Sequence, residues 1–238
     1  MAAPLLTRRG GTRNARTGWS TAKGRKHERA VLKVSSNAST LPLLRLLQLA
    51  SPTLPVGAYS YSQGLERAVE DGIVCDEPGA ARWIEDVLRF SVAYCEGACF
   101  AAMHEAAAAS DSGRLAHLNA AFLASRESAE LRAETVQLGH STVRLLAQLD
   151  LMPAWMRSSL RVMPEPSYPC AWACAACAFD ITRNEALAAY LWSWLENQVL
   201  AAVKLVPLGQ SAGQRILLRL GEIVSEIAAG LEPCTEPW

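Results

Sequence analysis

Residues 125–149, with the sequence SRESAELRAETVQLGHSTVRLLAQL, carry the clearest structural signal in the chain. In an α-helix each residue is rotated by about 100° from the one before it, and with this rotation four leucines and two threonines of the stretch fall on one side. The members of this stripe are Leu131, Thr135, Leu138, Thr142, Leu145 and Leu149. A second stripe is polar and consists of Arg126, Glu130, Glu134, Gln137, Ser141 and Arg144. We therefore predict one long helix with a core face and a polar ribbon on the side away from the core.

Gly139 lies in the interior of this predicted helix. Glycine costs roughly 1 kcal/mol against alanine at such a position. A glycine in this place predicts that a neighbouring backbone or side chain comes close to the helix.

The same periodicity continues through nearly every segment after Leu41, and alternating β-branched runs with hairpin turns do not occur. We therefore predict an all-α fold, a single compact multi-helix domain. In the first half of the chain we expect a helix at 41–48, a short one capped by Ser60 and Gln63 and ended by Gly72, and a long one from Asp76 and Pro78 to about Ala109. A helix capped by Asp111 and the helix at 125–149 follow. The last three expected helices are an apolar one that ends near Phe179, one that begins at Thr182 and Glu185 and ends before Pro207, and one that begins at Ser211 and Gln214 and ends at Gly230. A Pro-containing loop at 51–59 and a Pro-rich link at 152–169 interrupt the helices.

The composition of 50% hydrophobic and 19% charged residues over 238 residues suits one globular domain with a tail. Residues 1–33 hold nine Lys or Arg against one Glu. We expect a disordered basic tail over 1–38, a helical domain over 39–232 and a short C-terminal tail over 233–238. The longest apolar run has ten residues, short of the roughly 20 needed to span a bilayer, so no membrane segment is expected.

Seven cysteines, an odd number that we expect to lie in helices and not in loops, indicate reduced thiols in a cytoplasmic protein. Two cysteine groups have spacings that also suit a soft metal: Cys95 with Cys99, and Cys170 with Cys174 and Cys177. Packing is the favoured interpretation, because free cysteine behaves as a small buried hydrophobe. The four histidines (His27, His104, His117 and His140) are scattered and support neither group. We predict no metal ligands and no cofactor in this chain.

The sequence contains no phosphate-binding Gly-rich loop ending in Gly-Lys-Ser/Thr, no dinucleotide-binding Gly-x-Gly-x-x-Gly and no His-Glu-x-x-His. It also lacks the Gly-x-Ser-x-Gly nucleophile elbow. We therefore predict that the protein is not an enzyme.

Three ordered motifs resemble those of the UreF family of urease accessory proteins. They are LQLASPTLPVGAYSYSQGLE at 47–66, the start of the central stretch at 125–139, and KLVPLGQ at 204–210 followed by Gln214. The resemblance implies an all-helical homodimer that binds UreD, recruits the GTPase UreG and helps to load nickel into apo-urease. It also implies that the complex, and not this chain alone, handles nickel.

The candidate partner-binding residues come from these motifs. They are Pro55, Gly57, Tyr59, Tyr61, Gln63 and Glu66 in the first, Arg126, Glu130, Arg132 and Glu134 in the second, and Gln210 and Gln214 in the third. A loop with two tyrosines and little charge has the composition of an interface anchor. The alternative interpretations are a simple turn for the loop, a solvated face for the ribbon and a helix cap for Gln214.

A second functional class is a helical regulatory or nucleic-acid-binding protein that uses the basic tail. Residues 34–238 hold 14 Lys or Arg against 22 Asp or Glu. Phosphate contact needs basic residues clustered on a folded face, so the acidic body argues against nucleic acid as a partner.

Overall fold

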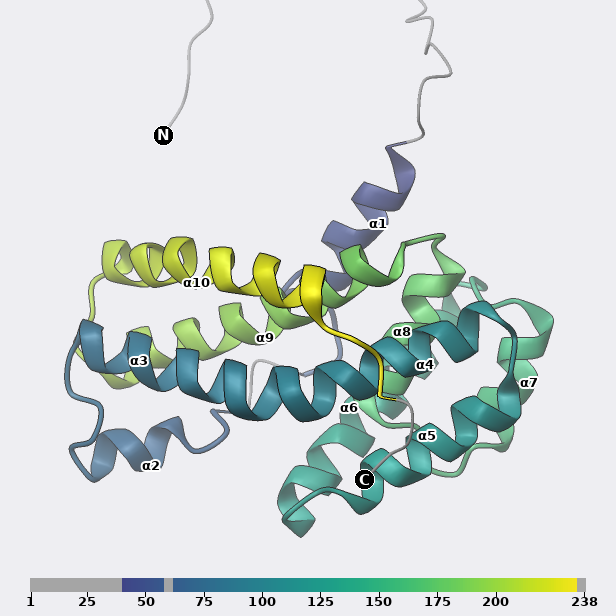
Figure 1. Cartoon of the computed structure of the whole chain (residues 1–238), viewed down its shortest axis with the longest axis horizontal. Helices are drawn as coiled ribbons and strands as arrows, with labels where there is room; N and C mark the ends of the chain where they lie inside the picture. Colours follow the sequence, from purple (N-terminus) through teal and green to yellow (C-terminus); the bar gives the residue numbers. More distant parts are fainter. Residues whose placement is uncertain (1–39, 58–61, 235–238) are drawn as a thin grey trace, which may run out of the picture. The chain divides into compact units, whose positions relative to one another are not determined.

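The computed structural model describes residues 40–57 and 62–234, and these form helices joined by short links, without strands (Figure 1). The helices are α1 (Leu41–Ala50), α2 (Leu65–Glu70), α3 (Glu77–Val87), the π-helical segment η2 (Leu88–Gly97), α4 (Ala98–Ala108), α5 (Ser112–Ala124), α6 (Ala129–Gln148), α7 (Ala154–Val162), α8 (Tyr168–Ala178), α9 (Arg183–Leu205) and α10 (Gln210–Gly230). The all-α prediction is confirmed. None of these helices is long and apolar enough to cross a membrane. The predicted basic tail, 1–38, lies outside the described residues.

The long helix expected from Asp76 to about Ala109 is present as one continuous rod made of α3, η2 and α4 (Figure 1). Asp76 begins it as the N-cap, because its Oδ1 accepts a hydrogen bond of 2.7 Å from the backbone N–H of Gly79. The sequence pattern did not predict the ten π-helical residues in its middle. A π-helical turn holds more residues than an α-helical turn, so η2 changes the direction in which the side chains leave the rod.

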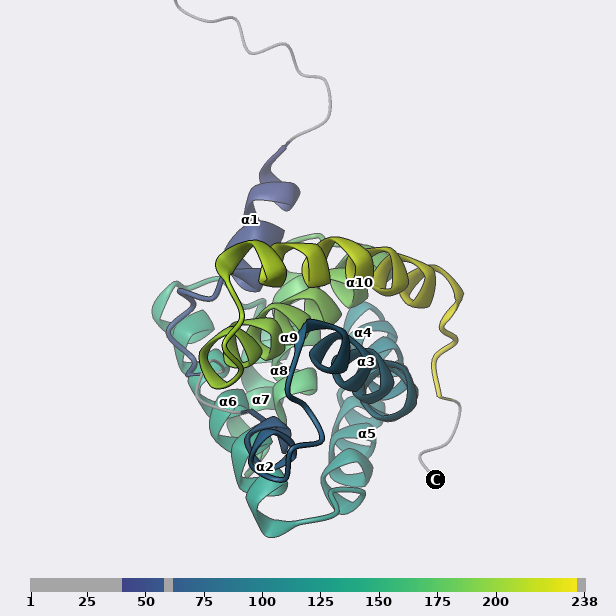
Figure 2. The same ribbon diagram turned by 90° about the vertical axis from the view of Figure 1, so that its left-hand side faces the viewer.

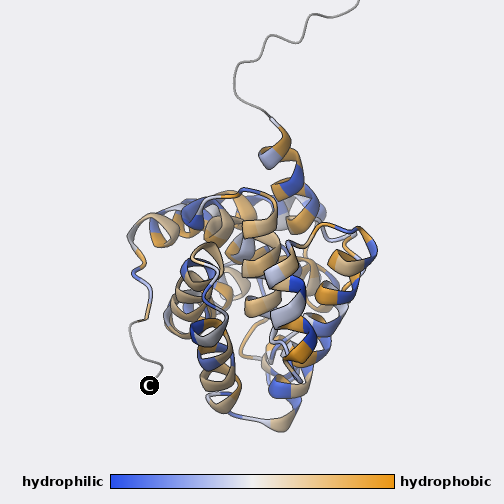
Figure 3. Cartoon of the chain, turned by 90° about the vertical axis from the view of Figure 1, so that its right-hand side faces the viewer, coloured by the Kyte–Doolittle hydropathy of each residue, from blue (hydrophilic) through white to orange (hydrophobic). Residues whose placement is uncertain are grey.

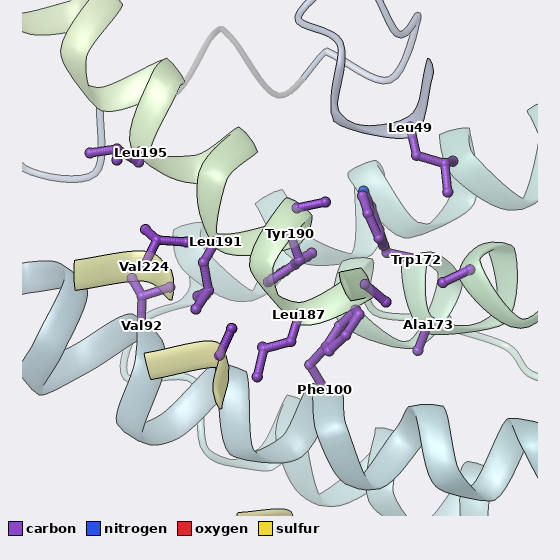
Figure 4. Packing of buried hydrophobic residues seen from close by; sticks show 14 of the residues in the cluster. Leu49, Val92, Phe100, Trp172, Ala173, Leu187, Tyr190, Leu191, Leu195 and Val224 are labelled. Carbon is purple, nitrogen blue, oxygen red and sulfur yellow. The ribbon is translucent and has the colours of Figure 1, made fainter. Parts of the chain in front are cut away.

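The core is centred on α8, whose residues from Pro169 to Ala176 are all buried. A helix that is apolar all round has to be covered on every side, and α4, α6 and α9 cover this one (Figure 2). Phe100 of α4, Trp172 of α8 and Tyr190 of α9 meet there as an aromatic group (Figure 4). The rings of Phe100 and Tyr190 stack with centroids 4.8 Å apart, and the indole of Trp172 meets Tyr190 edge-on at 5.7 Å.

The prediction for Gly139 is confirmed. A Cβ atom at this position of α6 would lie 1.9 Å from the carbonyl oxygen of Pro166. The link before α8 is held against the helix at this point, because the backbone N–H of Tyr168 donates to Oγ1 of Thr135 at 3.1 Å. On the other side, Oδ1 of Asn119 in α5 accepts from the N–H of Ser167 at 2.8 Å. Gly139 therefore allows the link to lie directly on the backbone of α6.

Several local predictions were wrong in detail. The core face of α6 contains Leu146 in place of Leu145, and Leu149 is exposed. The link at 152–169 contains α7, which the prolines had concealed. Two predicted capping boxes do not open their helices: α2 begins at Leu65 after a left-handed Gly64, and α10 begins at Gln210 after Gly209.

The other two predicted caps are confirmed. Asp111 accepts from the backbone N–H of Arg114 at 2.9 Å and begins α5. Thr182 and Glu185 form a capping box at the start of α9.

The seven cysteines are free thiols. Cys99, Cys170 and Cys174 are buried, in agreement with a packing role, whereas Cys75 is exposed. The expectation that the cysteines sit in helices fails for Cys75 and Cys234, which lie in links outside the helices.

Helix α1 packs against α9 and carries an unusually apolar exposed face (Figure 3). Leu43, Leu44 and Leu47 are 55%, 58% and 59% exposed. Single exposed leucines are common on soluble proteins, but several on one short helix mark a surface suited to contact with another protein.

Candidate functional site

Glu96 lies near the end of η2, and its carboxylate is almost enclosed by the fold. Its side chain is 20% exposed. Oε2 of Glu96 accepts a hydrogen bond of 3.4 Å from Nη1 of Arg126, and Oε1 accepts from the hydroxyl of Tyr190 in α9. The guanidinium of Arg126 lies over the ring of Phe122, 4.2 Å from its centroid. Arg126 therefore joins the end of α5 to the π-helical segment by an ion pair and a cation–π contact.

A second chain of hydrogen bonds lies beside the first. Nε1 of Trp194 in α9 donates to Oε1 of Gln63 at 2.6 Å, and Nε2 of Gln63 donates to Oε1 of Glu134 at 2.9 Å. These bonds connect the link before α2 with α6 and α9. Gln63 has a positive φ of 49°, which is uncommon for a residue with a side chain.

Burial raises the pKa of both carboxyl groups, Glu134 and Glu96. It raises the pKa of Glu134 to about 7, against the lowering effect of the Gln63 hydrogen bond. The nearby charge of Glu96 raises the pKa of Glu134 further, and the charge of Arg126 lowers it. The pKa of Glu96 is also raised, mainly by burial, although the Tyr190 hydrogen bond and the Arg126 charge oppose the change. Two acids therefore share one guanidinium in a poorly hydrated site.

These groups surround a cavity of about 50 Å³ that is also lined by Thr135, Leu138, Tyr168 and Ser193. A single water needs roughly 10–15 Å³ of such space, so the cavity has room for a few water-sized groups and not for an organic substrate. Within the described residues, the Nε–H of Arg126 is buried without a hydrogen-bond acceptor. The arrangement suits a polar junction that fixes the positions of helices, and it lacks the room that a catalytic pocket needs.

The structure brings together three of the predicted site residues, Gln63, Arg126 and Glu134. The polar ribbon as a whole is not one helix face, because α6 begins at Ala129, with Ser128 as the N-cap. Arg126 precedes the helix, and its side chain is only 13% exposed. The prediction that Arg126 and Glu134 lie on a surface away from the core was therefore wrong.

The remaining predicted residues lie apart from this cluster. Arg132 forms an ion pair of 2.6 Å with Glu165. Glu130 is exposed in the first turn of α6. The exposed residues on other segments are Pro55, Glu66, Gln210 and Gln214, and Gly57 has a φ of 87°. Tyr59 and Tyr61 lie outside the described residues. The partner-binding role of all twelve candidate residues, inside and outside the cluster, stays a prediction.

Sequence reasoning missed Glu96, Tyr190 and Trp194. One signal was available for Glu96: it is the only charged residue between Val92 and Met103, a stretch that otherwise suits a buried helix. A single acid in such a stretch requires a buried partner. Tyr190 and Trp194 fit the helical periodicity expected between Thr182 and Pro207, so their polar contacts had no sequence signal.

No group of three or more His, Cys, Asp or Glu side chains within 40–57 and 62–234 is arranged to hold a metal ion.

Comparison with known proteins places the chain in a family. The family model described as UreF matches residues 74–221. The urease accessory protein UreF of Azoarcus sp. (strain BH72) is 59% identical over 187 residues, covering 77% of this chain and 80% of the relative. The UreF of Dechloromonas aromatica (strain RCB) is 53% identical over 190 residues, covering 79% and 83%, and that of Nitrosococcus oceani is 46% identical over 175 residues, covering 74% and 78%. A family match over most of the helical body, with relatives of this identity, means that the chain belongs to the UreF family of urease accessory proteins.

Proposed function

We propose that this chain acts in the cytoplasm as a non-catalytic adaptor in the maturation of the nickel centre of urease. In this role it binds UreD, recruits the GTPase UreG to apo-urease, and works as a homodimer within that complex. The observation that carries the proposal is the 59% identity to a urease accessory protein UreF over most of both chains. The family consists of accessory proteins and not of enzymes.

Two structural features support an adaptor. The exposed leucines Leu43, Leu44 and Leu47 of α1 offer apolar area of the kind found at the centre of protein interfaces. The cluster of Glu96, Arg126 and Tyr190 ties together elements that are far apart in the sequence. A surface held by such a cluster loses little conformational freedom when a partner binds.

The proposal is tested by supplying this chain to cells that express its own urease, UreD and UreG but lack a UreF. We expect urease activity and nickel content to be restored, and tagged chain to co-purify with UreD and UreG. Leu44→Asp should leave the chain folded while weakening co-purification and activation. The matched control is Val162→Asp, at a residue of α7 that is 79% exposed. If both the unaltered chain and the Val162→Asp control fail to activate urease, the adaptor function is contradicted.

We further propose that the chain alone binds no nickel tightly and leaves nickel transfer to its partners. This rests on the sequence, in which the histidines are scattered and the paired cysteines suit packing. Calorimetric titration of the purified chain with Ni²⁺ tests it. Stoichiometric Ni²⁺ binding with a Kd below the micromolar range would contradict this proposal if the double variant Cys174→Ala with Cys177→Ala abolished the binding.

A further inference from the structure

The four described residues that follow α10 run from its end across the rod and lie against the junction of η2 and α4 (Figure 1). Cδ2 of Leu231 comes so close to Gly97 that a Cβ atom there would lie only 2.9 Å away. The backbone N–H of Cys234 donates to the carbonyl oxygen of Ala98 at 3.2 Å. Residues 97–99 therefore hold this C-terminal segment, which we define as residues 231–234.

The third contact of the C-terminal segment is between two thiols. Sγ of Cys234 lies 3.8 Å from Sγ of Cys99. A disulfide needs a sulfur separation of about 2.05 Å, so the two atoms have to approach by less than about 2 Å. Cys234 lies outside any helix, where small backbone rotations can supply this movement, whereas Cys99 is fixed in α4.

The two cysteines differ in accessibility. Cys99 is 1% exposed, and Cys234 is partly exposed. Burial raises the pKa of the Cys99 thiol, and the neighbouring Cys234 raises it further. Because the thiolate is the reactive form of cysteine, an oxidant from solvent reacts first at Cys234, and Cys99 is placed to act as the resolving thiol.

We propose that Cys99 and Cys234 form a redox-responsive pair, in which a peroxide joins the two thiols and fastens the C-terminal segment to α4. In the first step, the Cys234 sulfur attacks one oxygen of hydrogen peroxide, the O–O bond breaks, and Cys234 sulfenic acid and one water result. In the second step, the Cys99 sulfur attacks the Cys234 sulfur, the S–O bond breaks, and the proton of Cys99 leaves with the hydroxide as a second water. Two thiols and one peroxide thus give one disulfide and two waters, and a dithiol reductant reverses the change.

The buried cysteines of α8 and the exposed Cys75 differ from this pair. Cys170 and Cys174 are fully buried one turn apart on α8, where no oxidant reaches them. Cys75 is exposed in the link before α3 and is a suitable control, because it is more accessible to solvent than Cys234 and has no part in the contact with Cys99. The bond between Cys99 and Cys234 closes a loop of 135 residues, and a disulfide that closes a long loop stabilises the folded state against the unfolded chain.

The experiment uses the purified full-length chain, reduced and then treated with a small excess of hydrogen peroxide. The protein is then unfolded in denaturant so that N-ethylmaleimide reaches and blocks every free thiol, and the digested protein is analysed by mass spectrometry. We expect a peptide pair linked through Cys99 and Cys234, two blocked thiols fewer per chain, and a rise in Tm of several degrees that dithiothreitol reverses. Cys75→Ser should retain all three results, and Cys234→Ser should lose them while remaining folded.

Three results would overturn the proposal. One is over-oxidation of Cys234 to the sulfinic acid while Cys99 still takes up N-ethylmaleimide. Another is a disulfide formed only between two chains. The third is the same loss of two thiols in Cys234→Ser as in the unaltered chain.

Discussion

At Glu134, burial outweighs the Gln63 hydrogen bond, and the pKa of the carboxyl rises from 4.5 to about 7. In the unfolded chain the carboxyl titrates near its ordinary pKa, so between the two values the folded state holds a proton that the unfolded state has lost. This contribution to stability is present in full at pH below about 4.5, falls as the pH rises and is gone above about 7.

The variant Glu134→Gln tests this assignment, because a glutamine keeps the oxygen that accepts from Gln63 and has no charge to lose. Relative to the unaltered chain, the variant should gain about 1 kcal/mol of stability between pH 5 and pH 8, a value reduced by the partial exposure of the site. Urea unfolding at the two pH values measures the change. An identical pH dependence of the two proteins would show that Glu134 is well hydrated.

Arg126 provides a second prediction at this scale. Its replacement by alanine leaves the enclosed carboxylate of Glu96 without a cation, and breaking such a pair costs roughly 3 kcal/mol. We expect Arg126→Ala to lower the urea midpoint clearly. Glu130→Ala, at an exposed residue of the first turn of α6, should lower the midpoint much less, because it removes only surface hydrogen bonds and a favourable charge at the start of the helix. Equal urea midpoints for the two variants would mean that Arg126 is solvent-exposed, as the sequence pattern suggested.

These residues show where the sequence stopped being informative about the site. The partners of the two hydrogen-bond chains are between 30 and 131 positions apart, and helical periodicity describes only neighbours within a few turns. The periodicity extended the predicted helix and its polar ribbon back to Arg126, although α6 begins only after Ser128, its N-cap. The family motifs contain Gln63, Arg126 and Glu134, but they do not show that these residues meet around Glu96.

At the scale of the elements, patterns that depend on local chemistry were predicted well. The apolar periodicity gave the helices, and Asp76, Asp111 and Thr182 gave three of their starts. Helix α7 was missed because a proline on each side of it suggested a link, and η2 because a π-helix has the same composition as its α-helical neighbours. Such features are decided by packing against the rest of the domain, which the local sequence does not contain.

Gly139 gives the prediction that belongs to this scale. Although alanine is the better helix former, Gly139→Ala should lower the free energy of unfolding by at least about 2 kcal/mol, because its methyl group meets the carbonyl of Pro166. Gly113→Ala in α5 is the matched control. A Cβ there makes only an ordinary contact at 3.6 Å, so this variant should be neutral or more stable by up to about 1 kcal/mol. Denaturant titration compares the two, and a Gly139→Ala protein as stable as the control would contradict the close approach.

For the molecule as a whole, the expected division into a basic tail and a helical body remains a prediction from the sequence. The tail has no periodic apolar face with which to join a core. We expect removal of residues 1–37 to leave both the Tm and the binding of UreD and UreG unchanged. Differential scanning calorimetry and co-purification measure these. A Tm lower by several degrees would mean that the tail contributes to the folded domain.

The π-helical segment has a consequence for how this chain tolerates changes of length. Every residue removed from an α-helix turns the part before the deletion by about 100° relative to the part after it. The wider turns of a π-helix hold extra residues, and the loss of one is absorbed when the turn tightens to an α-helical turn. Removing Ser91, an exposed residue of η2, therefore leaves α3 and α4 close to their present register, whereas removing the buried Ala101 from α4 turns the residues before it against those after it. Ser91→Ala changes no register and should be harmless. We therefore expect deletion of Ser91 to preserve cooperative thermal unfolding and deletion of Ala101 to abolish it, so that homologous chains should vary in length within η2 far more readily than within α4.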